Sequence, residues 1–440
     1  MSAQSPQWIA TARLLRRTGF GTSGPRVDAV VGQDWSTYLD TLLDADPDSD
    51  PGAVATPMPV FPPAPGWPDQ LVGDELSAAL LARDNLISSQ ATELAHWWVR
   101  RIAAVHEPIH EKLTLVWHNH FATSTAKVRY ATYMAAQNQK LRTLKLGDFR
   151  TLAYAMLTDA AMLSWLDGKD NVAESPNENL SREFMELFTL GEGNGYTESD
   201  VKEGARALTG WTVAPDGQTK VVADKHDSQT KTVLGQTGNL DAEGFCDAVL
   251  NHPASASYVA TRLWKQLASD SPPSPQTLAR LVSAYGPDRN LKALTKAILL
   301  DPEFVTASSV NNPMEWLLGV VRTLELTLDS DAEAGTAFDI LTVLGQKPLY
   351  PPDVAGWPQG RAWVSTASIT SQTWAVGKLA DRGDLSVIEE AGKNDRIDAA
   401  GYLIGVGAWT DQTVAGLKPF AKNPRALFMA SVNTPEYLTT

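Results

Sequence analysis

The strongest constraint on the fold of this chain is a nearly continuous series of helix-patterned segments. Between Leu76 and Leu166, apolar residues return every three or four positions, and Gly147 followed by Asp148 is the pairing expected where one helix ends and the next begins. Two more helices are predicted at about 177–190 and 198–209, and helical patterns resume from Ala242. We therefore expect a mainly α fold, a multi-helix globular bundle.

Three segments interrupt this helical pattern. Eight prolines between Pro47 and Pro68 predict a long extended loop, residues 212–239 predict a small β-hairpin insertion, and residues 344–363 form a second Pro-rich loop. We divide the chain into N-terminal helices with a Pro-rich wrapping loop (1–75), a helical core lobe that holds the candidate site (76–240) and a C-terminal helical lobe (241–440).

Composition excludes several classes of protein. The 37 basic and 51 acidic side chains give a net charge of −14, which disfavours binding to nucleic acid. Cys246 is the only cysteine, so neither an intramolecular disulfide nor a cysteine-based zinc site can form. No run of 18 apolar residues predicts a transmembrane segment, and the N-terminus lacks the pattern of a signal peptide. The expected location is cytoplasmic, unless the chain is exported together with a partner.

A row of polar residues follows the apolar face of the predicted helix "SPNENLSREFMELFTLG", residues 175–191. On a helix that turns 100° per residue, Asn179, Glu183 and Glu186 fall within about 60° of one another, beside the apolar stripe, and Arg182 borders Glu186. Two carboxylates beside an apolar surface are placed where one pKa can be raised and the other held down. We therefore predict acid–base catalysis by Glu183 and Glu186.

A purely structural explanation covers part of this row. Ser175 and Glu178 fit a capping box, with Pro176 at the first helical position. Arg182 is spaced to pair with Glu178 and Glu186, one turn away on either side.

His120 is the histidine with the strongest claim to a role in the site. It lies on the apolar stripe of the predicted helix "IHEKLTLVWHNHF", where its ring needs a buried hydrogen-bond partner. Glu183 or Glu186 would make an acid–base pair with it, whereas a backbone carbonyl would make it a packing residue. A divalent metal site is the third alternative, with His118 or His226 as a further ligand, although no cofactor is firmly implied.

Two loops supply further candidates. His226 and Asp227 are adjacent in "HDSQTK", a pattern that also suits an Asx turn. Asp353 lies between Tyr350, Trp357 and Trp363, and aromatic rings of this kind suit the binding of sugars. The sequence contains no Walker A or GxSxG motif of the kind found in P-loop nucleotide-binding proteins and serine hydrolases.

Four segments resemble one large bacterial family, the domain of unknown function numbered 1800. They are "LVWHNHFATS", "PNENLSREFMELFTLGEGNGYTESDVKEGARALTGW", "HDSQTKTVLGQTG" and "LGQKPLYPPDVAGWPQGRAW", in that order, and the likeness extends from "ARLLRRTGFG" almost to the C-terminus. The matching positions include Trp117, Asn119 and His120, then residues 177–186, Asp200, Arg206, Trp211, His226, Asp227, Lys231 and Gly235.

The resemblance implies no established activity. It does imply frequent export and a gene often found beside that of a sulfatase-like partner, and the missing export signal departs from that habit.

Three hypotheses about function follow from these observations. The first is a hydrolase acting on a polysaccharide or cell-envelope glycan through a buried Glu/His pocket, with Glu183, Glu186 and His120 as catalytic residues. Substrate would be bound by Asn179, Arg182, Trp117, Asn119, His226, Asp227 and Trp357. Because Glu183 and Glu186 are only one turn apart, the second carboxylate could instead be Asp200, Asp227 or Asp353.

The second hypothesis is a metal-dependent enzyme with His and Glu ligands. The third is a non-catalytic partner of an exported sulfatase-like protein.

Overall fold

The computed structural model describes residues 4–63 and 65–440 of the chain, and within them it confirms the mainly α fold. Twenty-four α-helices and two small antiparallel sheets of two strands each make up the regular structure of these residues. None of the helices described combines the length and apolar character needed to cross a lipid bilayer.

The N-terminal region holds more helix than the sequence predicts. Three helices precede the first Pro-rich segment, and a fourth lies inside it because Asp50 caps a short helix that begins at Pro51. The expectation that this whole segment is extended was therefore wrong for residues 51–55. The helices are α1 (Pro6–Arg17), α2 (Gly24–Val30), α3 (Trp35–Asp44), α4 (Pro51–Ala55) and α5 (Gly73–Ala104).

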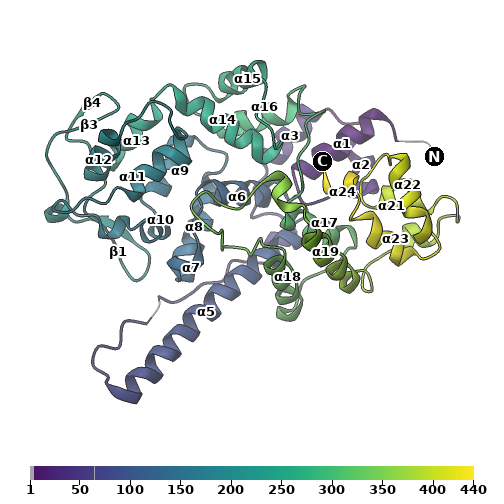
Figure 1. Ribbon diagram of the computed structural model, residues 1–440, viewed down its shortest axis with the longest axis horizontal. Helices are drawn as coiled ribbons and strands as arrows, with labels where there is room; N and C mark the ends of the chain where they lie inside the picture. Colours follow the sequence, from purple (N-terminus) through teal and green to yellow (C-terminus); the bar gives the residue numbers. More distant parts are fainter. Residues whose placement is uncertain (1–3, 64) are drawn as a thin grey trace.

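Helix α5 projects from the body of the protein like an arm (Figure 1). The Pro-rich loop runs beside the arm, where Arg83 donates to the carbonyl of Pro65 at 3.0 Å and stacks over the ring of Trp67. The inner half of α5 returns to the core through Trp98 and Ile102.

The helical lobe predicted after residue 76 is present. Asp148 caps the helix that follows Gly147, as predicted. The elements are α6 (Ile109–His120), α7 (Thr125–Val128), α8 (Ala131–Leu144), α9 (Phe149–Leu157), α10 (Ala160–Trp165), η1 (Gly168–Asp170), α11 (Asn179–Glu183), η2 (Phe184–Thr189) and α12 (Glu198–Ala207).

The predicted hairpin is two separate hairpins. Strands β1 (Trp211–Val213) and β2 (Thr219–Val221) form the first, and β3 (Lys231–Val233) and β4 (Gln236–Gly238) form the second, with η3 (Ala223–Lys225) between them. The second turn uses Leu234 and Gly235, both with positive φ, which suits a two-residue hairpin loop.

Helices fill the rest of the chain, interrupted by the predicted Pro/Trp loop around residue 350. They are α13 (Ala242–Leu250), α14 (Ala254–Leu267), α15 (Pro275–Tyr285), α16 (Leu291–Leu300), α17 (Pro313–Thr323), α18 (Asp331–Val343), η4 (Gly360–Trp363), α19 (Thr366–Leu379), α20 (Ser386–Glu389), α21 (Arg396–Leu403), α22 (Asp411–Leu417), η5 (Lys418–Phe420), α23 (Pro424–Ser431) and α24 (Pro435–Leu438).

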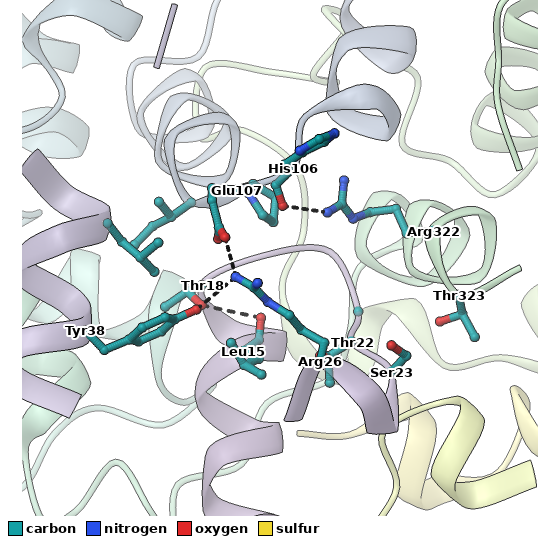
Figure 2. A pocket seen from close by; sticks show the side chains of 14 residues that line it. Leu15, Thr18, Thr22, Ser23, Arg26, Tyr38, His106, Glu107, Arg322 and Thr323 are labelled. Carbon is teal, nitrogen blue, oxygen red and sulfur yellow. Dashed lines mark hydrogen bonds and ion pairs between the residues drawn. The ribbon is translucent and has the colours of Figure 1, made fainter. Parts of the chain in front are cut away.

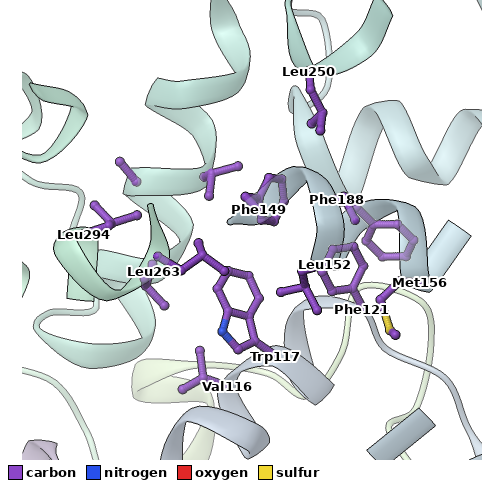
Figure 3. Close-up of a cluster of buried hydrophobic side chains, with 14 of the residues drawn as sticks. Val116, Trp117, Phe121, Phe149, Leu152, Met156, Phe188, Leu250, Leu263 and Leu294 are labelled. Atoms are coloured by element: carbon purple, nitrogen blue, oxygen red, sulfur yellow. The ribbon is translucent and has the colours of Figure 1, made fainter. Parts of the chain in front are cut away.

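Two large hydrophobic cores hold these helices together. One joins Leu14 and Leu39 to helices between residues 109 and 307, and the other joins Phe20 to residues 94–161 and 314–438. Helix α6 contributes to both cores, because Trp117 packs in the first (Figure 3) and Leu115 in the second. Each core draws on all three predicted segments of the chain, and the division at residues 75 and 240 stays a prediction.

Candidate functional site

The polar row lies on α11 and its continuation, η2. The predicted capping box is wrong, because the backbone N–H of Ser175 pairs with Val172 and helix α11 begins only at Asn179. Asn171, a buried residue, instead accepts a hydrogen bond from the N–H of Asn177, and the side chain of Asn177 accepts one from Asn179. This chain of amide contacts fixes the entry to the helix.

The second half of the predicted helix is a π-helix, η2. Its last turn is wider than an α-turn, since the N–H of Leu190 reaches the carbonyl of Met185, five residues earlier. The carbonyls at the end of η2 then need outside partners. The hydroxyl of Tyr258 donates to Leu187 at 2.7 Å, and Nε2 of His120 contacts the carbonyl oxygen of Phe188 at 2.9 Å.

Arg182 is surrounded by carboxylates. It makes two parallel hydrogen bonds to Glu198, at 2.8 and 2.7 Å, a third to Glu178 at 3.0 Å, and an ion pair with Glu186 at 3.6 Å. The predicted pairs with Glu178 and Glu186 are therefore confirmed. Because its donors already face three carboxylates, Arg182 organises the site.

Glu183 differs from its neighbours because it has no partner. Its carboxylate is partly buried and makes neither a hydrogen bond nor an ion pair with any residue that the structure describes. Burial and the nearby charge of Glu186 raise its pKa, and Asp353 adds to this effect while Arg182 opposes it. A raised pKa is the direction of shift that general-acid catalysis by a carboxyl group requires.

Asp353 reaches this region from the Pro/Trp loop between α18 and η4. The loop is fixed to the end of α6, since Oδ1 of Asn119 accepts a hydrogen bond from the N–H of Trp357 at 2.7 Å. The neighbouring Gly356 has φ 91°, and a Cβ there would lie 2.3 Å from the same oxygen, so only glycine fits. One Asp353 oxygen accepts from the N–H of Ala355, and the side chain is otherwise exposed.

Tyr196 completes the surroundings of Glu186. Burial and the Glu186 carboxylate raise the pKa of the Tyr196 hydroxyl to about 12, so the phenol stays protonated at neutral pH. We call Glu178, Arg182, Glu183, Glu186, Tyr196, Glu198 and Asp353 together the carboxylate cluster.

Sequence reasoning missed Tyr196 and Glu198 in this cluster, and Asn171 and Tyr258 around it. The Asn-rich stretch at 171–179 was the one visible signal for Asn171.

His120 is buried in the core and makes no hydrogen bond to any residue of the carboxylate cluster among the residues that the structure describes. Its ring contacts Trp117 and Phe121, and burial lowers the pKa of the imidazole to about 3, so it is neutral. The backbone-carbonyl alternative describes its hydrogen bond, and the picture of a buried pocket shared by His120 and the two glutamates is corrected. His120 satisfies the end of η2.

The two tryptophans predicted to bind substrate are buried. Trp117 donates to the carbonyl of Lys145 at 3.0 Å, and Figure 3 shows its indole among apolar side chains such as Val116 and Leu263. Trp357 packs against His118, with ring centres 5.5 Å apart. Neither ring presents an exposed face on which a sugar could stack. The side-chain oxygen of the buried Asn119 already accepts a hydrogen bond from Trp357 in the Pro/Trp loop.

His226 and Asp227 tie the second hairpin to α12. Nδ1 of His226 lies 2.9 Å from the carbonyl of Thr209, and Asp227 pairs with Arg206 at 2.7 Å. Asp200 is also engaged, because it accepts from Thr197 and from the N–H of Leu234. Of the three alternatives for a second carboxylate, Asp353 alone is placed to influence Glu183.

The geometry does not favour a metal centre. Within residues 4–63 and 65–440, no three His, Cys, Asp or Glu side chains converge as metal ligands would. His118, the proposed additional ligand, lies between the rings of Trp98 and Trp357.

Comparison with known proteins places the chain in a family. The model of the family described as "Protein of unknown function (DUF1800)" matches residues 13–439, nearly the whole chain. Neither the curated proteins nor the solved structures that were compared yielded a match. The match spans both cores, the π-helix and the loop that carries Asp353, and the chain therefore belongs to the DUF1800 family.

Proposed function

We propose that this protein is a hydrolase that cleaves glycosidic bonds in a polysaccharide or cell-envelope glycan, with Glu183 as its general acid. The proposal is carried by one observation, the partly buried and unpartnered Glu183 carboxylate, whose pKa is raised by burial and by Glu186. Glycoside hydrolysis needs two carboxyl groups in different states, one protonated and one ionised.

The second carboxylate in this proposal is Asp353. Glu183 donates its proton to the glycosidic oxygen while Asp353 accepts a proton from the water that attacks the anomeric carbon, and the bond between that carbon and the oxygen breaks. Glu186, which pairs with Arg182, lies beside Glu183 and raises the pKa of Glu183. Asp353 comes from a separate loop, so the two carboxyl groups belong to different elements of the fold.

The charge around the site favours an uncharged or amino-bearing glycan. Arg182 is the one cation of the carboxylate cluster, against five acidic side chains. Sulfated or phosphorylated chains would be repelled by this surface.

Release of reducing ends tests the proposal. Wild-type protein is incubated with dextran, laminarin, xylan, chitosan and isolated peptidoglycan, with carrageenan as the sulfated comparison. We expect release from at least one unsulfated polymer and a loss of at least about 100-fold in Glu183→Gln, a general-acid contribution. Glu178→Gln is the matched control, since Glu178 already pairs with Arg182. Equal activity in wild type and Glu183→Gln would refute the assignment.

A second candidate function, assembly with a sulfatase-like protein, is favoured by the arm. Apolar side chains are exposed on α5 and on the Pro-rich loop that leads into it, among them Val60 at 94%, Trp67 at 62%, Val72 at 79% and Leu81 at 63%. The acidic Asp69, Asp74 and Glu75 are exposed near its tip. We infer that its occupant is a protein with an apolar groove rimmed by basic residues.

Size-exclusion chromatography of the two purified proteins tests this candidate. Trp67→Ala should abolish co-elution of the sulfatase-like protein. Trp374→Ala, which removes an exposed tryptophan on α19, should leave co-elution unchanged. Co-elution that survives Trp67→Ala would rule the arm out as the binding surface.

A further inference from the structure

We propose that a cavity near the N-terminus binds a neutral polyhydroxy compound of the size of a single sugar ring. The cavity lies between the α1–α2 turn, α3, the segment before α6, and α17, and it is remote in sequence from Glu183 (Figure 2). Its volume is about 200 Å³, the space of roughly seven water molecules at about 30 Å³ each. That volume suits one ring, and the inference does not depend on the hydrolase proposal.

An arginine and a glutamate form the polar side of this cavity. Arg26 pairs with Glu107 and donates to the hydroxyl of Tyr38 at 3.2 Å, as Figure 2 shows. Both contacts use the same nitrogen of Arg26, so its other N–H groups remain as donors, and Glu107 keeps one oxygen as an acceptor. Donors and an acceptor side by side match adjacent hydroxyl groups, each of which can donate and accept.

Thr22 supplies an independent sign of a missing partner. Its side chain lines the cavity and is only 9% exposed, yet its hydroxyl has no hydrogen-bond partner among the described residues. A buried hydroxyl left without a partner costs about 1–3 kcal/mol. The next residue, Ser23, does not use its hydroxyl to cap α2, although it stands at the capping position.

The wall that carries these hydroxyls is rigid. Gly21 has φ 72° and presses against α17, where a Cβ on it would lie 2.6 Å from Cα of Gly319. The methyl group of Thr22 packs on Gly405, where an added Cβ would lie 2.6 Å from it. The site is therefore preformed, which lowers the entropic cost of binding.

Charge balance argues that the ligand is neutral. Arg322 also lines the cavity, but it donates to backbone carbonyls at the end of α5, including those of Val105 and His106. The positive charge of Arg26 is matched by Glu107. The charge of Arg322 lies near Glu107 and Asp50, so the two cations at the cavity are matched by two carboxylates. An apolar ligand would leave the free N–H groups of Arg26 and the hydroxyl of Thr22 without partners.

The remaining wall is apolar and suits the C–H face of a sugar. It is formed by Leu15, Leu42 and Ile109 with the ring of Tyr38.

Ligand-observed NMR and calorimetry with the full-length protein test the proposal. The probes are D-glucose, D-galactose, D-mannose, N-acetylglucosamine and myo-inositol, with sodium phosphate and sodium acetate as anionic comparators. We expect saturable binding of at least one neutral probe and none of the anions. The same result is expected in Glu183→Gln, so failure here is distinguishable from failure of the hydrolase proposal.

Thr22→Val is the decisive variant, because it keeps the methyl contact with Gly405 and removes only the hydroxyl. It should weaken binding about three- to tenfold, the effect of one hydrogen bond, without lowering the melting temperature of the free protein. Ser88→Ala, in a different cavity beside α5, should bind like wild type. Binding unchanged in Thr22→Val, stronger binding of phosphate or acetate, or no binding of any neutral probe would each overturn the proposal.

Discussion

Two groups of acidic and basic side chains, one around Glu111 and one around Glu183, show how the same residue types can have opposite consequences. Glu111 on α6 is 1% exposed and accepts hydrogen bonds from Arg101 at 2.8 Å, from Arg142 at 2.9 Å and from the indole of Trp98 at 3.2 Å. Although burial alone would raise its pKa, the two arginines outweigh that effect and lower it. Every oxygen of this carboxylate is used.

Glu183 is more exposed and yet less satisfied. Its pKa is raised, while its neighbours Glu178 and Glu186 are paired with Arg182. The number of hydrogen-bond and ion-pair partners, more than burial, separates a structural carboxylate such as Glu111 from a candidate catalytic one such as Glu183. The ion pairs of Glu111 with Arg101 and Arg142 hold α5, α6 and α8 together. The Glu183 carboxyl group, which has no such partner, is available for proton transfer.

Removal of the buried carboxylate should have the largest effect on stability. Glu111→Gln leaves two buried guanidinium groups without their counter-charge, and breaking such a pair costs about 3–5 kcal/mol. Urea unfolding monitored by circular dichroism should show this loss. Glu178→Gln, on the partly exposed ion pair, should lose less than about 1 kcal/mol. Similar losses in the two variants would contradict the comparison.

Loss of the hydrogen bond between Asn119 and Trp357 should cause the next largest loss of stability. This hydrogen bond links the core to the candidate site. Asn119→Ala leaves the N–H of Trp357 without its partner, which should cost about 1–3 kcal/mol. Because the same contact positions Asp353, hydrolytic activity should fall as well. Asn85→Ala, an exposed position on α5, is the control for both measurements. Loss of stability with full activity would mean that the loop does not serve the site.

Glu183→Gln should change the free energy of unfolding by a smaller amount and in the opposite direction, because it should stabilise the protein. A carboxyl group whose pKa is raised by folding contributes stability that is present below its unfolded pKa and is lost as the pH rises through the folded pKa. Glu183→Gln should therefore be more stable than wild type at pH 7, by at most about 0.5 kcal/mol because solvent screens this carboxylate. The difference should vanish at pH 3. Thermal unfolding at both values checks the sign, and a less stable variant at pH 7 would contradict it.

Local sequence patterns predicted the helices well and the site only partly. Asp148 and the Arg182 pairs follow from spacings of three or four residues, which the chain obeys. The capping box at Ser175 was predicted from the same kind of local spacing. It does not form, and the buried Asn171 instead accepts a hydrogen bond from the N–H of Asn177. The π-helix was invisible to a helical wheel, which assumes a constant 100° per residue.

The contacts that decide the site join distant parts of the chain. His120 finds its partner 68 residues away on the carbonyl of Phe188, and a backbone oxygen leaves no mark in the sequence. Asp353 influences Glu183 only because Asn119, far from both in sequence, holds the loop in place. Periodicity carries no information on such pairings, and tertiary packing decides them.

The most direct test of the account is the pH titration of the two contrasted glutamates by NMR, using protein labelled with ¹³C at the glutamate side-chain carboxyl. Glu111→Gln and Glu183→Gln identify the two resonances by their absence. We expect Glu183 to titrate above the ordinary glutamate pKa and Glu111 below it. A Glu183 midpoint at or below the ordinary value would contradict the claim that this carboxyl group is set apart from its neighbours, and with it the proposed role as a general acid.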